Sequence, residues 1–173
     1  MSYTEGYKER WGGEKTIMEQ KENIELLSIT SGNAYQPFNW SVGVYGSKFL
    51  AELRDNKKFY GVRCSSCGRV YVPLRKVCGR CHAAMEELVP LPDEGEIVVC
   101  AIIQFGFVDP STGIQRPVPY TYAYIRLDGA DTLFPHFVDS TDPERVKVGS
   151  RVKAVFEEKR TGSVMDVRHF TLV

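Results

Sequence analysis

Apolar and polar residues alternate along the second half of the chain, with a period of two. Five segments carry this pattern: 96–108, 120–127, 132–138, 151–157 and 163–171. In the fourth segment Val152, Ala154 and Phe156 alternate with more polar neighbours, as expected for strands in a sheet with one face in water. Turn signals such as Asp128-Gly129 separate the segments. The pattern therefore predicts five short β-strands.

These strands define the expected architecture. No helix-length segment lies between them, which argues against a parallel sheet with crossover helices. A five-stranded Greek-key barrel of the OB type is the simplest way to close five such strands. The fold class expected is mainly β: an OB-type barrel preceded by a small metal-binding ribbon and by an N-terminal helix or arm.

Two segments within the first 60 residues follow a helical period instead. Thr16 and Glu19 form a capping-box pattern, which predicts a short helix over 16–27. Ser47 is expected to cap a second helix that runs to about Phe59 and ends before Gly61. Its apolar stripe consists of Phe49, Leu50 and Leu53.

Between these helices, residues 28–46 are rich in glycine, asparagine and aromatic residues and show no sustained period, which predicts an extended arm. The aromatic residues of this arm are Tyr35, Phe38, Trp40 and Tyr45. Two interpretations remain open. The rings either cover the chain's own core or form a docking surface for a partner, since exposed aromatic residues gather at interfaces.

Composition places the chain among ordinary soluble proteins. It has 173 residues, of which 43% are hydrophobic and 25% charged, enough for one core and a small added module. Lys and Arg together number 22 and so do Asp and Glu, which argues against a non-specific nucleic-acid binder. The N-terminus lacks a signal-peptide pattern, and the longest apolar stretch, 97–103, is too short to cross a membrane. We expect a cytoplasmic protein.

Four of the five cysteines have the spacing of a metal site. Cys64 and Cys67 form one Cys-x2-Cys pair, and Cys78 and Cys81 form another after ten intervening residues. Each pair can bring two sulfurs to one ion at about 2.3 Å, and four thiolates leave no open position, so one structural Zn²⁺ per chain is predicted. The spacing alone does not distinguish zinc from iron. His82 is an alternative ligand.

The remaining residues offer no catalytic set. Cys100 lies in a strand-like run and is expected to be buried and inert. The three histidines are His82, His136 and His169, and no nucleophile, base and orienting acid can be grouped around them. No catalytic residue is therefore predicted. His136 has aromatic and proline neighbours that could line a channel.

The only basic patch lies around the cysteines. Between residues 54 and 82 the chain has one acidic residue, Asp55, against eight cations: Arg54, Lys57, Lys58, Arg63, Arg69, Arg75, Lys76 and Arg80. Three interpretations compete. The cations balance the negative charge of a zinc-tetrathiolate site, bind the phosphates of a nucleotide-bearing ligand, or contact a nucleic acid.

The order of motifs over residues 46–173 resembles the rubredoxin-like zinc ribbon plus OB-fold family of acyl-CoA-associated proteins. The matching features are the helix with Phe49, Leu50 and Leu53, then Arg63-Cys64-x2-Cys67-Gly68, Pro73, Cys78-x2-Cys81, Gly95, Pro119-Tyr120, Leu127-Asp128-Gly129, and Val148-Gly149-Ser150-Arg151-Val152. Members typically bind a thiolase-like enzyme and help enclose the coenzyme A part of its acyl-CoA substrate. Among members with a thiolase partner, the accessory subunits of benzoylsuccinyl-CoA thiolase are a candidate match, although no residue here identifies an aromatic substrate.

The resemblance implies a non-catalytic accessory subunit in a hetero-oligomer with a thiolase-like enzyme. The domains expected are an N-terminal extension (1–45), a helix (46–62), a zinc ribbon (63–90) and an OB barrel (91–173). Arg75, Lys76 and His136 are the candidate CoA-binding residues. The candidate partner contacts are Phe38, Trp40, Tyr45, Phe49 and Leu53. The rival interpretation is a module that binds single-stranded nucleic acid, because OB barrels and zinc ribbons also serve that role.

Overall fold

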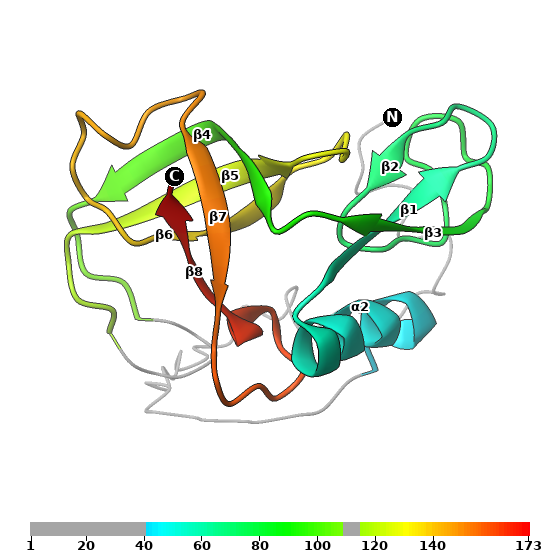
Figure 1. The fold of residues 1–173 in the computed structure, drawn as a ribbon, viewed down its shortest axis with the longest axis horizontal. Coiled ribbons are helices and arrows are strands. Elements are labelled where there is room, and N and C mark those ends of the chain that lie inside the picture. Colours follow the sequence, from blue (N-terminus) through cyan, green and yellow to red (C-terminus); the bar gives the residue numbers. More distant parts are fainter. Residues whose placement is uncertain (1–40, 109–114) are drawn as a thin grey trace, which may run out of the picture. The chain divides into compact units, whose positions relative to one another are not determined.

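A computed structural model describes residues 41–108 and 115–173 of the chain (Figure 1). The predicted short helix over 16–27 and the aromatic residues Tyr35, Phe38 and Trp40 lie outside the described residues. The elements described are α2 (Gly43–Asn56), β1 (Phe59–Cys64), β2 (Val70–Tyr71), β3 (Met85–Leu91), β4 (Glu94–Ile103), β5 (Tyr120–Leu127), β6 (Phe134–Val138), β7 (Arg151–Phe156), the short 3-10 helix η2 (Val164–Asp166) and β8 (Val167–Leu172). Within this part of the chain, no helix is long and apolar enough to cross a membrane.

Helix α2 exists where a helix was predicted, but both of its ends differ. It begins at Gly43, so Ser47 lies inside the helix and is not its cap. It ends at Asn56, because Lys57 adopts the left-handed conformation (φ 54°, ψ 40°) and Phe59 already starts β1. The predicted end at Phe59 is therefore wrong. The apolar stripe is correct, since Phe49 and Leu53 are buried along it.

The metal-binding ribbon contains a three-stranded antiparallel sheet in the order β2-β1-β3. Gly61 does not end the helix but lies in β1, opposite Val89 of β3. A Cβ atom at this position would come within 2.5 Å of Val70 Cγ1 on β2, so only glycine fits without rearrangement. The strands of this sheet were not predicted from the sequence.

The five predicted strands form the closed barrel β4-β5-β6-β8-β7 (Figure 1). Neighbouring strands are antiparallel except β6 and β8, which pair in parallel through Val138 and Phe170. The prediction of a five-stranded barrel is confirmed, and the bounds of β5 match the predicted ones. The last strand starts later than predicted because residues 164–166 form η2.

A cluster of phenylalanine rings joins the helix, the ribbon and the barrel. The ring of Phe59 on β1 lies 6.5 Å from Phe49 of α2, measured between centroids. It also lies 5.4, 5.7 and 6.3 Å from the barrel residues Phe134, Phe156 and Phe170. Such contacts add about 0.5 to 1.5 kcal/mol per pair to the burial of the rings. Ribbon and barrel therefore share one core.

Hydrogen bonds connect the ribbon to the turn between β5 and β6. The Val70 N–H donates to Asp131 Oδ2 at 2.8 Å, and the Asp131 N–H donates to the Val70 carbonyl at 2.9 Å. The Val72 N–H donates to Thr132 Oγ1, whose hydroxyl donates to the Val72 carbonyl, both at 2.8 Å. These bonds satisfy backbone groups at the outer edge of the ribbon sheet.

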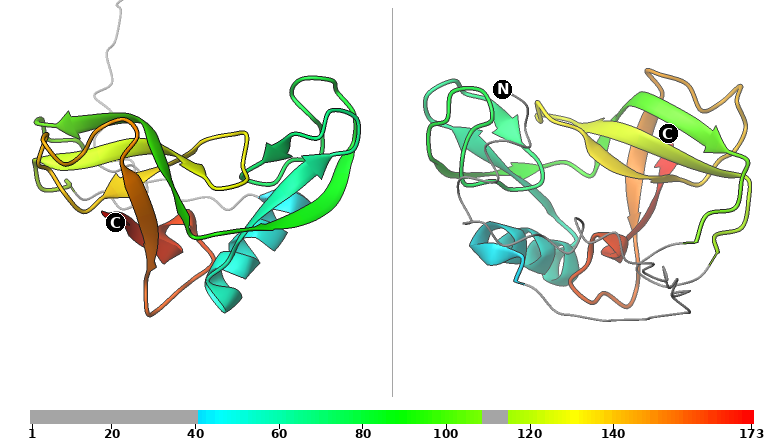
Figure 2. Two further views of the ribbon diagram at one scale, coloured as in Figure 1. Left: turned by 45° about the horizontal axis from the view of Figure 1, so that its top comes forward. Right: turned by 180° about the vertical axis from the view of Figure 1, so that it is seen from behind.

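The loop between β7 and β8 fixes the C-terminal end of α2, beside which it lies (Figure 2). Arg160 Nε donates to the Arg54 carbonyl, which satisfies one of the free carbonyls at the helix end. The loop is held by the buried Asp166, whose carboxylate accepts from the N–H groups of Thr161, Gly162 and Ser163.

We predict that Phe59→Ala lowers the free energy of unfolding by about 3 to 5 kcal/mol, because it removes the ring that contacts all the others and leaves a cavity. The matched control is Phe105→Ala, which truncates a ring that is 67% exposed and should cost less than about 0.5 kcal/mol. Denaturant titration of both variants measures the difference. Equal losses in the two variants would contradict the central role of Phe59.

Candidate metal centre

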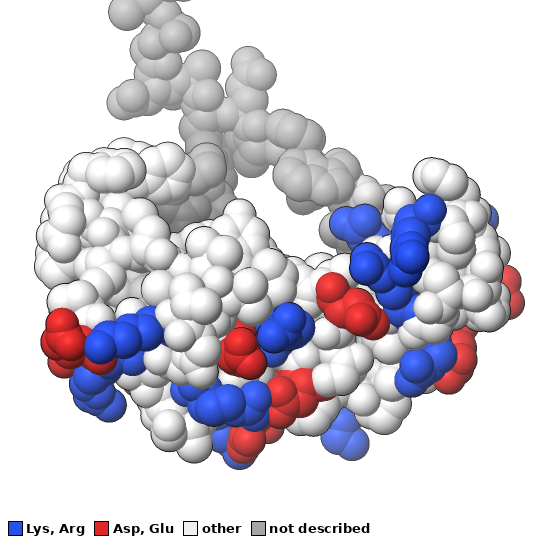
Figure 3. Space-filling model, turned by 90° about the horizontal axis from the view of Figure 1, so that it is seen from above, with Lys and Arg blue, Asp and Glu red and all other residues white. Residues whose placement is uncertain are grey.

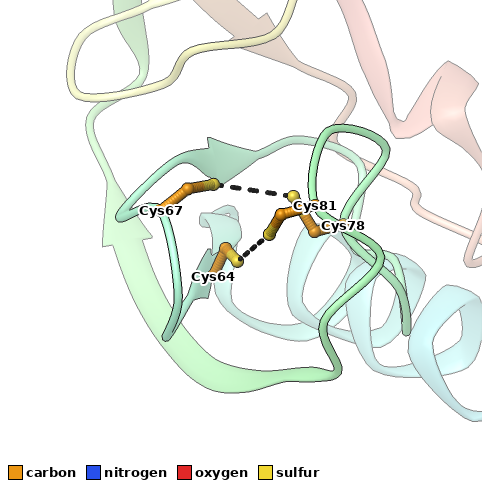
Figure 4. A group of neighbouring side chains, drawn as sticks. All are labelled: Cys64, Cys67, Cys78 and Cys81. Carbon is orange, nitrogen blue, oxygen red and sulfur yellow. Dashed lines mark hydrogen bonds between the residues drawn. The ribbon is translucent and has the colours of Figure 1, made fainter.

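The four cysteines of the paired motifs converge on one point (Figure 4). Cys64 ends β1 and Cys67 lies in the turn that follows, while Cys78 and Cys81 lie in the loop between β2 and β3. Their sulfurs all lie within 4.8 Å of one another. Cys64 Sγ is 3.4 Å from Cys81 Sγ, and Cys67 Sγ is 3.6 Å from Cys78 Sγ.

The two halves of the cluster are built by the same backbone pattern. In the first, the Gly68 N–H donates to the Cys64 carbonyl at 2.9 Å and the Cys64 N–H donates to the Arg69 carbonyl at 2.8 Å. In the second, the His82 N–H donates to the Cys78 carbonyl at 3.0 Å and the Cys78 N–H donates to the Ala83 carbonyl at 2.9 Å. Each half is therefore a tight turn that aims two sulfurs to the same side.

His82 has a backbone role in this pattern. Gly68 and His82 occupy equivalent positions and both have positive φ, 73° and 59°. Glycine tolerates this conformation, and histidine is among the side chains that adopt it most often. The glycine inside the second motif, Gly79, does not have a positive φ. His82 is exposed and is not part of the sulfur cluster, so it is not placed as a ligand.

The cluster fits a tetrahedral ion. Sulfur ligands at about 2.3 Å from a tetrahedral ion lie about 3.8 Å from one another. Two of the separations between the sulfurs are 3.4 and 3.6 Å, and all of them lie within 4.8 Å, so these values bracket the expected distance. A set of four sulfurs is typical of zinc or iron.

The pKa values of two of the thiols also favour a bound cation. The Tyr71 hydroxyl lies 3.4 Å from Cys78 Sγ and lowers the pKa of Cys78 to about 5. The backbone N–H of Arg69 favours the Cys67 thiolate, but burial and the three neighbouring sulfurs raise the pKa of Cys67 to about 11. One thiol thus ionises readily while its neighbour resists a second negative charge. A bound cation removes that conflict.

Tyr71 was not identified from the sequence. It lies seven residues before Cys78 on β2, and only the return of the chain from β2 brings its hydroxyl to the sulfur. Arg75 stacks over the same ring, with its guanidinium carbon 5.7 Å from the centroid. No known spacing between a tyrosine and a cysteine pair predicts such a contact.

The cations around the cluster divide into two groups. Arg54 pairs with Asp55 at 2.7 Å and Arg63 with Glu87 at 3.3 Å. Arg75 and Lys76 are exposed, as are Arg69 and Arg80. None of these four forms an ion pair with the residues that the structure describes. Figure 3 shows Lys and Arg side chains gathered over the ribbon.

His136 does not line a channel, contrary to expectation. It is 3% exposed, inside the barrel, with ring centroids of Phe134 and Phe170 at 5.7 and 6.0 Å. Its Nδ1 accepts from the Phe137 N–H at 2.8 Å, so the neutral ring donates from Nε2 to the Val164 carbonyl at 3.2 Å. Burial lowers the pKa of His136. Because both nitrogens are occupied and the ring is enclosed, the assignment of His136 to CoA is wrong.

The predicted partner contacts on α2 also need correction. Phe49 and Leu53 are 2% and 0% exposed and belong to the chain's own core, so neither side chain is available to a partner. Tyr45 is half-buried, and its hydroxyl donates to the Met85 carbonyl at 2.7 Å. Phe38 and Trp40 lie outside the described residues.

The fifth cysteine is separate from the cluster. Cys100 Sγ lies 3.8 Å from the Val146 carbonyl, on the barrel. Its side chain is half-buried, where full burial was expected.

Two family models cover this part of the chain. The ChsH2 rubredoxin-like zinc ribbon domain matches residues 51–86, and the ChsH2 C-terminal OB-fold domain matches residues 88–157. Together they span the C-terminal part of α2, the ribbon and most of the barrel.

Curated relatives match the same region. A DUF35 domain-containing scaffold protein of Methanocaldococcus jannaschii is 33% identical over 105 residues, which are 60% of this chain and 71% of the relative. A protein of the same description from Methanothermobacter thermautotrophicus is 28% identical over 102 residues, 58% of this chain and 72% of the relative.

Two solved structures share the fold. The crystal structure of a DUF35-family protein of unknown function from Sulfolobus solfataricus matches with a TM-score of 0.53 and 25% identity, covering 75% of this chain and 84% of that one. The Ltp2-ChsH2(DUF35) aldolase matches with a TM-score of 0.53 and 15% identity, covering 77% and 97%, and shows the fold alone. The sulfur cluster, the barrel and these relatives agree: the chain belongs to the DUF35 family of ChsH2-type zinc-ribbon and OB-fold proteins.

Proposed function

We propose that this protein is a non-catalytic accessory subunit that binds a thiolase-like enzyme and helps bind the CoA part of its acyl-CoA substrate. The observation that carries the proposal is membership in a family whose curated relatives are described as scaffold proteins. One solved protein with the same fold is described as the Ltp2-ChsH2(DUF35) aldolase, a description that pairs a family member with an enzyme. The order of motifs in the sequence resembles that of acyl-CoA-associated proteins, and this resemblance is the reason to propose a thiolase-like partner and an acyl-CoA substrate.

We propose that the metal is one structural Zn²⁺ per chain, held by Cys64, Cys67, Cys78 and Cys81. Four thiolates fill a tetrahedral site, so the ion would stabilise the ribbon and would leave no position for substrate. Cytoplasmic thiols stay reduced, which keeps all four sulfurs available as ligands. The ribbon is then rigid enough to hold the cations on its surface in place.

For the CoA phosphates we propose Arg75 and Lys76. Both side chains are exposed next to the metal centre, and Arg75 is supported by the face of Tyr71. Arginine pairs with phosphate through two parallel N–H donors, and lysine adds a compact charge. Ligand phosphates would replace water around these cations without breaking an ion pair inside the described part of the protein.

The nucleic-acid alternative finds less support in the charges of the barrel. A groove that binds single strands needs cations that are free to follow the backbone. Here Arg126 pairs with Glu96, Arg151 with Asp128 and Arg168 with Glu157, at 3.4, 2.6 and 2.9 Å. In these three pairs the acidic and basic side chains of the barrel neutralise each other, and Figure 3 shows both signs side by side along one border of the molecule.

We predict about one equivalent of zinc per chain in protein purified without chelator. Cys78→Ser should release the metal and loosen the ribbon, because a closed site forms only with all four thiolates. Cys100→Ser is the matched control and should keep the metal. Metal analysis measures the stoichiometry, and full zinc occupancy in Cys78→Ser would refute the ligand assignment.

We predict that the protein co-purifies with a thiolase-like enzyme from its native host, and that acyl-CoA turnover by this enzyme requires it. The isolated protein should show little or no thiolase, aldolase or hydrolase activity. Affinity purification followed by assays of each component and of the complex tests both statements. The accessory role fails if the isolated protein turns over acyl-CoA as fast as the complex does.

We predict that Arg75→Ala/Lys76→Ala raises KM for acyl-CoA in the complex by roughly tenfold or more, since a charge-assisted hydrogen bond contributes about 1.5 to 3 kcal/mol. The value of kcat should change less, because phosphates remote from the reacting carbon are bound equally in ground and transition states. Arg145→Ala/Lys147→Ala removes the same charge from the barrel and should leave KM unchanged. If a double variant that keeps its zinc and its partner has normal kinetics, Arg75 and Lys76 do not bind the CoA phosphates. They would then only balance the negative charge of the zinc site.

A further inference from the structure

The barrel carries a groove that has no part in the metal centre. It has a volume of about 470 Å³ and lies at one end of the barrel. Its lining comes from the last residue of β4, the first residues of β5, Phe137 near the end of β6, and η2. Volumes of this size are typical of sites for small molecules. In OB barrels the corresponding strands and loops are the ones used for ligands.

The walls of the groove are aromatic and apolar. Tyr120 and Tyr122 of β5 pack edge-on against Phe137 of β6, with centroids 5.9 and 5.2 Å apart. Phe107 and Met165 also line the groove and are 52% and 39% exposed. Apolar side chains of this size that remain exposed together mark a binding site more often than isolated exposed residues do.

One cation lies among these rings. The guanidinium carbon of Arg116 is 3.8 Å from the centroid of Phe137 and 5.9 Å from that of Tyr120. A guanidinium that stacks on a ring keeps its N–H groups along its edge, where they can bind a carboxylate through two parallel hydrogen bonds. The rings hold this group flat before any ligand arrives.

Arg116 differs from three arginines on the strands of the barrel. Arg126, Arg151 and Arg168 each have a carboxylate partner, whereas the contacts of Arg116 within the described residues are with aromatic rings. None of the described residues that line the groove is acidic. Among the described residues that line the groove, Arg116 is therefore the single charged side chain.

We propose that this groove binds a small aromatic carboxylate. The flat ring of the ligand would lie against Tyr120, Tyr122 and Met165, and its carboxylate would pair with the edge of Arg116. A carboxylate carries one negative charge, which matches the one cation among the described residues that line the groove, whereas a phosphate monoester carries close to two. The proposal concerns a site of the chain itself and does not depend on the partner enzyme or on CoA.

The test uses the full-length, zinc-loaded chain and two probes of the same shape, 2-naphthoate and its neutral analogue 2-naphthamide. Calorimetric titration should show saturable binding of the acid with at least tenfold higher affinity than the amide. Arg116→Gln should reduce the affinity for the acid at least tenfold and leave that for the amide nearly unchanged. Arg126→Gln, which removes an exposed arginine from the same barrel, is the matched control and should change neither affinity.

A second variant tests ligand binding in the groove without changing Arg116. Met165→Glu places a negative charge at an exposed position of the groove and should abolish binding of 2-naphthoate while the zinc content and melting temperature stay the same. The proposal is overturned if the acid and the amide bind equally, or if Arg126→Gln weakens the acid as much as Arg116→Gln does. Tighter binding of adenosine monophosphate than of 2-naphthoate would reassign the groove to nucleotides.

Discussion

The packing of Phe59 against four other phenylalanine rings is the contact on which the rest of the structure depends. Phe59 begins β1, the central strand of the ribbon, and its neighbours come from α2, β6, β7 and β8. A small ribbon has too few residues to build a core of its own. By inserting this ring into the barrel, the ribbon shares the core of a larger domain.

The sulfur cluster lies at the other end of the same strand. β1 starts at Phe59 and ends at Cys64, so the aromatic cluster and the sulfur cluster are separated by one short strand of six residues. The bonds of Val70 and Val72 to Asp131 and Thr132 give the ribbon a further attachment. Loss of the metal would therefore loosen a strand that the barrel core also uses, which explains why a structural ion would matter in the proposed accessory role.

Two surfaces with different chemistry result from this arrangement. The ribbon is attached at the turn after Leu127, the last residue of β5, and carries the exposed cations Arg75 and Lys76. The aromatic groove lies near Tyr120, at the other end of β5. Seven residue steps along a strand correspond to roughly 23 Å. One rigid element thus separates a surface suited to phosphates from a groove suited to an aromatic anion.

The sequence by itself determined the features that depend on short spacing: the cysteine pairs, whose ligands are set within each tight turn, and the barrel strands, whose alternation of apolar and polar residues is local. Only the tertiary structure decided which side chains are buried. Phe49, Leu53 and His136 look the same in sequence as residues that face a partner. Their burial depends on the folded core, in which Phe49 packs against the distant Phe134 and His136 against the distant Phe170. The groove was also invisible to the sequence, because Arg116, Phe137 and Met165 meet only when the barrel closes, and no local pattern encodes a contact between residues on separate strands and loops.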